Sequence, residues 1–419
     1  MSMTSDQLHA AFVKTKQASY ALHSLDEAQI QTTLQCFADK IQARKDDLIA
    51  ENKKDLAKMA QDNPLYDRLL LNADRLDAIA DDVRKVSTLA SPVDDVIEHR
   101  TLQNGIDLSR IRVPLGVVSV IYEARPNVTM DVFSLCFRTR NACVLRGGTD
   151  AHHTNLMTLQ IIHDTLTEQG ISPDCAFLMP PEREHMPQML GAHDLIDVCI
   201  PRGSQALIDY VRENASIPVI ETGRGVVHVY VDDDADISKA ADIVSNAKLR
   251  RPSVCNSLDT LIIHEKQLPH LRTILEQISA KDVHINADEP AYTALGTFYD
   301  AGRLAHADAD SFDTEFLGLG MNIKTVSSLD DAMDHIQTYG SGHTEAIVTE
   351  NADKAAHFTR RINASSVMVN CSTAFADGGE YELGAEIGIS TQKLHARGPM
   401  GLEPLTSYKW VLRGNGQTR

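Results

Sequence analysis

The chain has 419 residues, a hydrophobic content of 43%, a charged content of 23% and a formal net charge of −18 at pH 7. This size predicts two or three domains, and the composition is typical of a soluble globular protein. The acidic balance argues against non-specific binding to nucleic acid, and no apolar run is long enough to span a bilayer.

The seven cysteines are scattered and odd in number, and neither a Cys-x-x-Cys pair nor a His-Glu-x-x-His helix occurs. This pattern favours reduced thiols over a disulfide framework and gives no reason to expect a metal site. The amino-terminal residues lack the basic and apolar pattern of a secretion signal. We therefore expect a cytoplasmic protein.

The amino-terminal part of the chain predicts helices. Residues 24–27 resemble a capping box that begins at Ser24, and apolar residues follow at helical spacing at Ile30, Leu34, Phe37, Ile41 and Leu48. Beyond residue 110, strands are predicted at 117–122, 142–145, 196–200, 226–231, 260–263, 346–348 and 367–369. Helical segments such as 155–169 and 352–362 separate several of them. This alternation indicates an α/β protein with mainly parallel sheets and helices on both faces.

One cysteine stands at the junction of a predicted helix and a predicted strand. Residues 250–256 read Arg-Arg-Pro-Ser-Val-Cys-Asn, and they follow a helical run at 240–249. A thiol at such a junction can face solvent, and the two arginines favour the thiolate that attacks a carbonyl carbon. A single cysteine is more often a small buried hydrophobe, but these flanking residues favour Cys255 as a nucleophile.

Four longer segments carry a family resemblance: residues 113–130 (VPLGVVSVIYEARPNVTM), 200–204 (IPRGS), 251–257 (RPSVCNS) and 384–402 (GAEIGISTQKLHARGPMGL). They resemble the gamma-glutamyl phosphate reductase family of the aldehyde dehydrogenase superfamily. The resemblance implies an α/β aldehyde dehydrogenase-like fold with a Rossmann-type cofactor domain, an α/β catalytic domain and a small oligomerisation element. The implied ranges are 1–107 and 123–226 for NADPH binding, 227–375 for the catalytic cysteine, 108–122 and 398–419 for oligomerisation, and 376–397 for an active-site loop. Departures from the family pattern occur at 224–227 and at Cys371.

The resemblance implies NADPH-dependent reduction of L-glutamyl 5-phosphate to L-glutamate 5-semialdehyde and phosphate, in proline biosynthesis, through a thioester on Cys255. It also suggests the side chain of Asn127 as an oxyanion donor, although Asn127 could equally be a plain turn residue. Glu221 corresponds to the carboxylate that activates water in hydrolytic relatives, and a structural role at a strand end is the alternative.

No Gly-x-Gly-x-x-Gly fingerprint is present, so the cofactor residues also follow from the resemblance. They are Arg146, Gly147, Gly148, Arg202, Gly203, Ser204, Glu315 and Phe316. Residues 202–204 precede a predicted helix, and the free N–H groups at a helix start can bind a phosphate. The alternative is that these residues only cap the helix, because Gly and Ser are common at helix starts. Glu315 could also be a merely solvated carboxylate.

An anionic substrate requires basic residues in this acidic chain. The candidates are Arg125, Arg251, Lys393, His395 and Arg397, and the alternative for Lys393 and Arg397 is an exposed face with structural ion pairs only. A homo-oligomer is expected through the strand at 108–113 and the tail at 408–412, and association with a glutamate 5-kinase is possible. The competing functions are an NAD(P)-dependent dehydrogenase of free aldehydes and a catalytically silent kinase scaffold. The acidic run at 232–234 is expected to be a surface feature.

Overall fold

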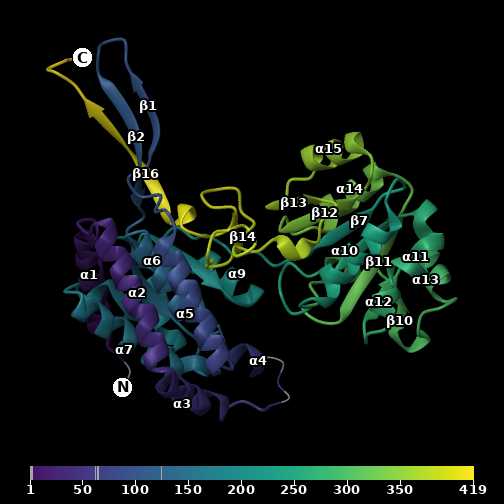
Figure 1. The fold of residues 1–419 in the computed structure, drawn as a ribbon, viewed down its shortest axis with the longest axis horizontal. Coiled ribbons are helices and arrows are strands. Elements are labelled where there is room, and N and C mark those ends of the chain that lie inside the picture. Colours follow the sequence, from purple (N-terminus) through teal and green to yellow (C-terminus); the bar gives the residue numbers. More distant parts are fainter. Residues whose placement is uncertain (1–2, 62, 64–65, 124) are drawn as a thin grey trace. The chain divides into compact units, whose positions relative to one another are not determined.

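The computed structural model describes residues 3–61, 63, 66–123 and 125–419 (Figure 1). The chain divides into two compact units. The first unit comprises the chain up to Thr222 with Glu382–Gly388 and Pro399–Arg419, and the second comprises Gly223–Tyr381 and Ile389–Gly398. None of the described helices combines the length and the apolar character that a bilayer crossing requires.

The described part of the first unit contains a four-stranded parallel sheet in the order β5-β4-β3-β6. Its strands are β3 (Val117–Tyr122), β4 (Ala142–Arg146), β5 (Ala176–Leu178) and β6 (Val198–Arg202). The predictions at 117–122 and 142–145 are confirmed, whereas β6 begins later than predicted and extends to Arg202. Tyr122 pairs with Arg202 and Ile121 pairs with Arg146, so the carboxyl ends of β3, β4 and β6 reach the same edge.

The described part of the first unit also contains nine α-helices. They are α1 (Ser5–Leu22), α2 (Glu27–Ala43), α3 (Lys45–Leu56), α4 (Tyr66–Leu69), α5 (Ala73–Thr88), α6 (Val128–Arg138), α7 (His152–Glu168), α8 (Met186–Leu190) and α9 (Gln205–Asn214).

The capping box predicted at Ser24 is wrong in its position. Asp26 is the N-cap of α2: its side chain accepts from the Gln29 N–H, and the Gln29 side chain accepts from the Asp26 N–H. Ser24 with Glu27 and Asp26 with Gln29 both match the spacing of a capping box, so the local sequence does not decide between them. The helical spacing also does not continue to Leu48 without a break, because α2 ends before Arg44 and Leu48 lies in α3.

A separate three-stranded antiparallel sheet belongs to the first unit, in the order β1-β2-β16. It consists of β1 (Val96–Thr101), β2 (Asp107–Pro114) and β16 (Thr406–Arg413). The last strand pairs with β2 from Thr406 opposite Pro114 to Arg413 opposite Asp107. Figure 1 shows this ribbon extending beyond the helices of the same unit.

Residues 223–381 are described throughout and form a seven-stranded parallel sheet in the order β10-β9-β11-β8-β7-β12-β13. Its strands are β7 (His228–Val231), β8 (Thr260–His264), β9 (His284–Ala287), β10 (Leu304–His306), β11 (Gly320–Val326), β12 (Thr344–Val348) and β13 (Ser366–Val369). The helices are α10 (Ile237–Leu249), α11 (Leu271–Ile274), α12 (Glu276–Ser279), α13 (Glu289–Leu295), α14 (Leu329–Tyr339) and α15 (Ala352–Arg361).

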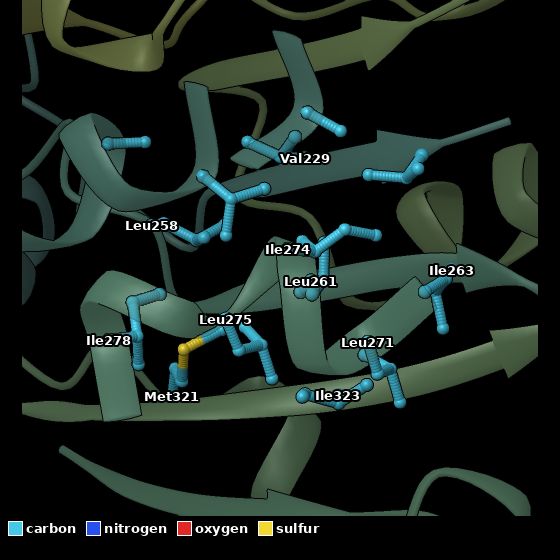
Figure 2. Packing of buried hydrophobic residues seen from close by; sticks show 14 of the residues in the cluster. Val229, Leu258, Leu261, Ile263, Leu271, Ile274, Leu275, Ile278, Met321 and Ile323 are labelled. Carbon is cyan, nitrogen blue, oxygen red and sulfur yellow. The ribbon is translucent and has the colours of Figure 1, made fainter. Parts of the chain in front are cut away.

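A hydrophobic core supports one face of this sheet. Figure 2 shows Leu271, Ile274 and Leu275 of the helical segment packed near Leu261 and Ile323 of the strands. All five side chains are fully buried, and each such burial contributes about 1.5–3 kcal/mol. The start of β8, which follows the Cys255 loop, is therefore held by the core of the unit.

The acidic run at 232–234 is only partly a surface feature. Asp232 is buried and accepts hydrogen bonds from the Tyr230 hydroxyl (3.0 Å) and the Thr349 hydroxyl (2.8 Å). Lys354 forms ion pairs with all three aspartates. The prediction was wrong for Asp232 because its burial depends on Thr349 and Lys354, which lie more than a hundred residues away in the chain.

Candidate active site

Cys255 lies in the loop between α10 and β8, and its residue is half-buried. Cys136, Cys143, Cys175 and Cys199 are buried instead. Burial raises the pKa of the Cys175 and Cys199 thiols to about 12, which makes these thiols unreactive at neutral pH. The position of Cys255 outside the core is what a nucleophile needs.

The loop around Cys255 is held by its neighbour Asn256, which sequence reasoning did not select. The Asn256 amide donates to the carbonyl oxygens of Ala374 (3.4 Å) and Ala376 (3.0 Å), and the Thr373 hydroxyl donates to the Asn256 carbonyl (2.7 Å). Asn256 is 6% exposed. Its only signal in the sequence is that it directly follows the cysteine, because its partners lie more than a hundred residues away.

The segment at 224–227 packs directly against the Cys255 loop. A Cβ atom on Gly225 would lie 1.7 Å from the Cys255 carbonyl oxygen, so only glycine fits this contact. The Gly225 N–H donates to Glu315 Oε1 (2.9 Å). Glu315 is thus brought to the cysteine loop, and Phe316 follows it with its N–H donating to Asp259 Oδ1 (3.0 Å).

In the first unit, the residues predicted to bind the cofactor meet at the carboxyl edge of the parallel sheet. Arg146 ends β4 and Arg202 ends β6, and both strands flank β3. A Cβ atom on Gly147 would lie 2.2 Å from Asn155 Nδ2, and one on Gly203 would lie 2.5 Å from Glu123 Oε2. Both glycines are therefore positions of close approach.

Ser204 is the N-cap of α9, but its side chain makes no capping bond. Its N–H instead donates to Glu123 Oε2 (2.9 Å). Sequence reasoning missed Glu123, which follows β3 inside the motif at 113–130. Its carboxylate lies at the helix start where a phosphate was expected.

Arg146 is a buried cation at this edge. It is 6% exposed, and its Nη2 donates to the Pro181 carbonyl (2.6 Å). Within the described part of the chain, no atom hydrogen-bonds to its buried Nε. Burial, reinforced by Arg183, lowers the Arg146 pKa, so an anion beside this guanidinium would relieve an unfavourable state.

Asn127 precedes α6, and its side-chain Nδ2 donates to Asp131 Oδ2 within that helix (2.8 Å). Burial raises the Asp131 pKa to about 6, and the field of Arg202 and the Asn127 hydrogen bond oppose this rise. Arg125 lies half-buried in the same turn, where its carbonyl accepts from the Val128 N–H (3.1 Å). One of the two N–H groups of the Asn127 amide is therefore engaged within this turn.

Glu221 follows a short parallel bridge between Val219 and Cys199. Its Oε2 lies 3.4 Å from Arg212 Nη1 on α9, and the two side chains are 27% and 47% exposed. The Glu221 carboxylate therefore takes part in a surface ion pair. Such a contact is consistent with the structural role that is the alternative to a catalytic role for Glu221.

The basic residues fall in both units. Arg125 belongs to the first unit, whereas Arg251, Lys393, His395 and Arg397 belong to the second. The last three lie in the loop between β14 (Ile389–Ser390) and β15 (Gly398–Pro399), not on a helix. Arg251, Lys393 and His395 are exposed. The Arg397 guanidinium donates to the side-chain and main-chain oxygens of Asn363, both at 2.6 Å.

The chain matches the aldehyde dehydrogenase family over residues 1–309 and 260–411. It is 50% identical to a gamma-glutamyl phosphate reductase of Pelodictyon phaeoclathratiforme over 97% of both chains. The crystal structure of the gamma-glutamyl phosphate reductase of Thermotoga maritima is similar with a TM-score of 0.93 and 36% identity, covering 98% of this chain and 99% of that one. An acetylating aldehyde dehydrogenase of Geobacillus thermoglucosidasius shares the fold, with a TM-score of 0.72, 16% identity and coverage of 99% and 98%.

Proposed function

The chain belongs to the gamma-glutamyl phosphate reductases of the aldehyde dehydrogenase family, and on this premise we propose that it reduces L-glutamyl 5-phosphate to L-glutamate 5-semialdehyde and phosphate in proline biosynthesis. The observation that carries the proposal is the half-buried Cys255 in a loop packed against Gly225 and, through it, Glu315. This arrangement combines a thiol outside the hydrophobic core with the segment expected to contact a nicotinamide ribose.

The Cys255 thiolate attacks the acyl carbon of the substrate, the carbon–oxygen bond to phosphate breaks, and a thioester forms. Bound NADPH supplies the hydride that reduces this thioester. The carbon–sulfur bond then breaks to give the aldehyde and to regenerate the thiolate. Each addition places negative charge on the carbonyl oxygen, and the Cys255 N–H with the Asn127 amide are the proposed donors. A donor of this kind contributes about 3–4 kcal/mol.

The edge of the first unit's sheet fits a dinucleotide phosphate. Its buried Arg146 carries an Nε atom to which no described residue hydrogen-bonds, and Gly147 lies beside it at the strand end. We assign Arg146–Gly148 and Arg202–Ser204 to the cofactor, with Glu315 and Phe316 on the nicotinamide side. Because Glu123 already accepts the Ser204 N–H, we expect Arg146 to contribute more to phosphate binding than the start of α9.

The substrate carries a phosphate and an α-carboxylate, so it requires cations in a chain of net charge −18. We assign this role to Arg125, Arg251, Lys393 and His395. The Arg397 guanidinium is hydrogen-bonded to Asn363. We propose that Arg397 adds positive charge to the site and also stabilises the loop that carries Lys393 and His395.

Phosphate dependence tests the proposed reaction. The enzyme is supplied with glutamate 5-semialdehyde and NADP, and NADPH formation is followed by absorbance with and without phosphate. We expect formation only with phosphate, because phosphate and not water cleaves the thioester. Equal rates without phosphate would identify a hydrolytic aldehyde dehydrogenase. NADPH binding without turnover in either direction would identify a silent scaffold.

We also propose that the ribbon of β1, β2 and β16 assembles the protein into a homo-oligomer. Tyr408, Trp410 and Leu412 are 52%, 45% and 58% exposed, and alternate residues of a strand share one face. The Arg110 guanidinium lies over the rings of Tyr408 (5.1 Å) and Trp410 (5.5 Å). A face of this kind, on a sheet with unpaired edge strands, favours pairing with a second copy.

A further inference from the structure

A buried lysine and a buried aspartate flank the Cys255 loop. Lys248 lies in the last turn of α10 and is 0% exposed, and Asp259 precedes β8 and is 2% exposed. Lys248 Nζ donates to the Leu258 carbonyl (2.8 Å), and the Leu258 N–H donates to the Ala247 carbonyl (3.0 Å). These two hydrogen bonds close the base of the loop that carries the nucleophile.

Asp259 joins this base to two other segments of the site. Its Oδ1 accepts from the Phe316 N–H (3.0 Å) and its Oδ2 accepts from the Val227 N–H (3.2 Å). Lys248 Nζ lies 5.6 Å from the centroid of the Phe316 ring, which is within cation–π range. Lys248 and Asp259 together therefore contact three segments: the base of the Cys255 loop, the residues after Gly225 that lead into β7, and the segment at 315–316.

The same segments meet again beside the nucleophile. Gly225 fits against the Cys255 carbonyl only because it lacks a Cβ atom, and its N–H is held by Glu315. A shift of the segment at 315–316 or of Val227 would thus be transmitted to the backbone of Cys255. Lys248 lies against the Phe316 ring, the Phe316 N–H is held by Asp259, and the preceding residue Glu315 holds the Gly225 N–H beside the cysteine loop.

Both charged groups are buried at an electrostatic cost. Burial lowers the Lys248 pKa to about 8 and raises the Asp259 pKa to about 7, and the charge of each partner opposes the effect on the other. Removal of one partner would leave an uncompensated buried group, whereas removal of both would not.

We propose that Lys248 and Asp259 are positioning residues that hold the Cys255 loop in register with the nicotinamide-side segment 315–316. The inference rests on the proposed role of Cys255 as nucleophile. It assigns neither residue a contact with substrate. Its specific consequence is that loosening the pair makes the thiol easier to reach but less competent in catalysis.

The test uses the full-length variants Lys248→Met and Asp259→Asn and the double variant that carries both changes. The matched controls are Lys239→Met and Asp242→Asn, which change exposed residues of α10. Three quantities are measured: thermal stability, kcat and KM of the phosphate-dependent reaction, and the rate of Cys255 alkylation by iodoacetamide, resolved by mass spectrometry. The double variant, which leaves no unpaired buried charge, keeps the test valid where a single variant does not fold.

In the folded double variant we expect kcat to fall about 10²-fold, as a displaced nucleophile would, while alkylation of Cys255 becomes faster. Unchanged kcat and alkylation would overturn the inference, and so would slower alkylation, because it would mean that Lys248 activates the thiol directly. Alkylation requires no substrate. If the wild type shows no phosphate-dependent turnover, the proposed function fails, and the alkylation rates still decide whether the pair positions the loop.

Discussion

The backbone of Gly225 touches the backbone of Cys255: a Cβ atom on the glycine would lie 1.7 Å from the cysteine carbonyl oxygen. These residues come from different loops, one before β7 and one before β8. The position of the proposed nucleophile therefore depends on a residue whose essential property is the absence of a side chain.

Gly225→Ala should lower kcat by about 10²-fold or more, because the new methyl group must displace the Cys255 backbone by a distance that disrupts attack geometry. Steady-state kinetics on the folded variant measure this effect. Gly296→Ala is the control, since a Cβ there would make an ordinary contact at 3.4 Å. Near-normal activity of Gly225→Ala would show that the loop adapts and that the contact is not needed.

Cys255→Ser should abolish the reaction in both directions while NADPH binding persists. A serine hydroxyl has no accessible ionised form, and its ester accepts hydride less readily than a thioester. Cys36→Ser, at another half-buried cysteine, should keep its activity. A purified Cys255→Ser enzyme with more than about a tenth of wild-type activity would refute the nucleophile assignment.

Glu221→Gln should reduce activity less than Cys255→Ser does and should cost less than about 1 kcal/mol of stability, because its ion pair with Arg212 is exposed. Arg212→Gln breaks the same pair from the other side and is the matched control. Denaturant unfolding and steady-state rates are compared for both variants. An activity loss confined to Glu221→Gln and as deep as that of the cysteine variant would assign the carboxylate a catalytic role.

Truncation after Gly401, which removes β16, should give an inactive monomer, and Trp410→Glu should weaken assembly without removing the strand. The reason is that a charge in a contact face is costly to desolvate. Light scattering at micromolar concentration measures the effect, and Tyr20→Glu, at another exposed aromatic residue, is the control. A full-length protein that is already monomeric would contradict the proposed assembly.

His335→Phe should reduce the loss of stability on acidification. Burial, with His228 as a second cause, lowers the His335 pKa from 6.5 to about 3. The unfolded chain therefore binds a proton that the folded protein does not, and stability falls as the pH drops below 6.5. Between pH 6.5 and pH 5, His335 lowers the free energy of unfolding by about 2 kcal/mol.

Phenylalanine fits the site in His335→Phe because the imidazole already packs among aromatic rings. Its ring centroid lies 5.0 Å from that of Phe312 and 4.7 Å from that of Tyr339. Denaturant unfolding at neutral and mildly acid pH measures the difference, and His357→Phe on the exposed face of α15 is the control. Identical pH dependence in wild type and His335→Phe would mean that folding does not lower the His335 pKa.

Much of the architecture could be predicted from the sequence because it depends on local periodicity. Short apolar runs alternating with helices predicted parallel sheets, and β3, β4 and β8 lie where those runs lie. The junction of α10 and β8 placed Cys255 in a loop for the same reason. The position of a helix start was less certain, because Ser24 with Glu27 and Asp26 with Gln29 both match a capping box. In the structure, Asp26 and Gln29 form it.

The sequence by itself therefore determined the class of fold, the loop that carries the thiol and the motifs of the family. Only the tertiary structure decided which side chains support that loop. Lys248, Asp259 and Gly225 lie outside the four family segments, and although Asn256 lies within one of them, the sequence does not show its partners. Asp259, Asn256 and Gly225 find their partners in segments distant in the chain. Hydrogen bonds of this kind exist only after the parallel strands have aligned, and burial then makes them costly to break.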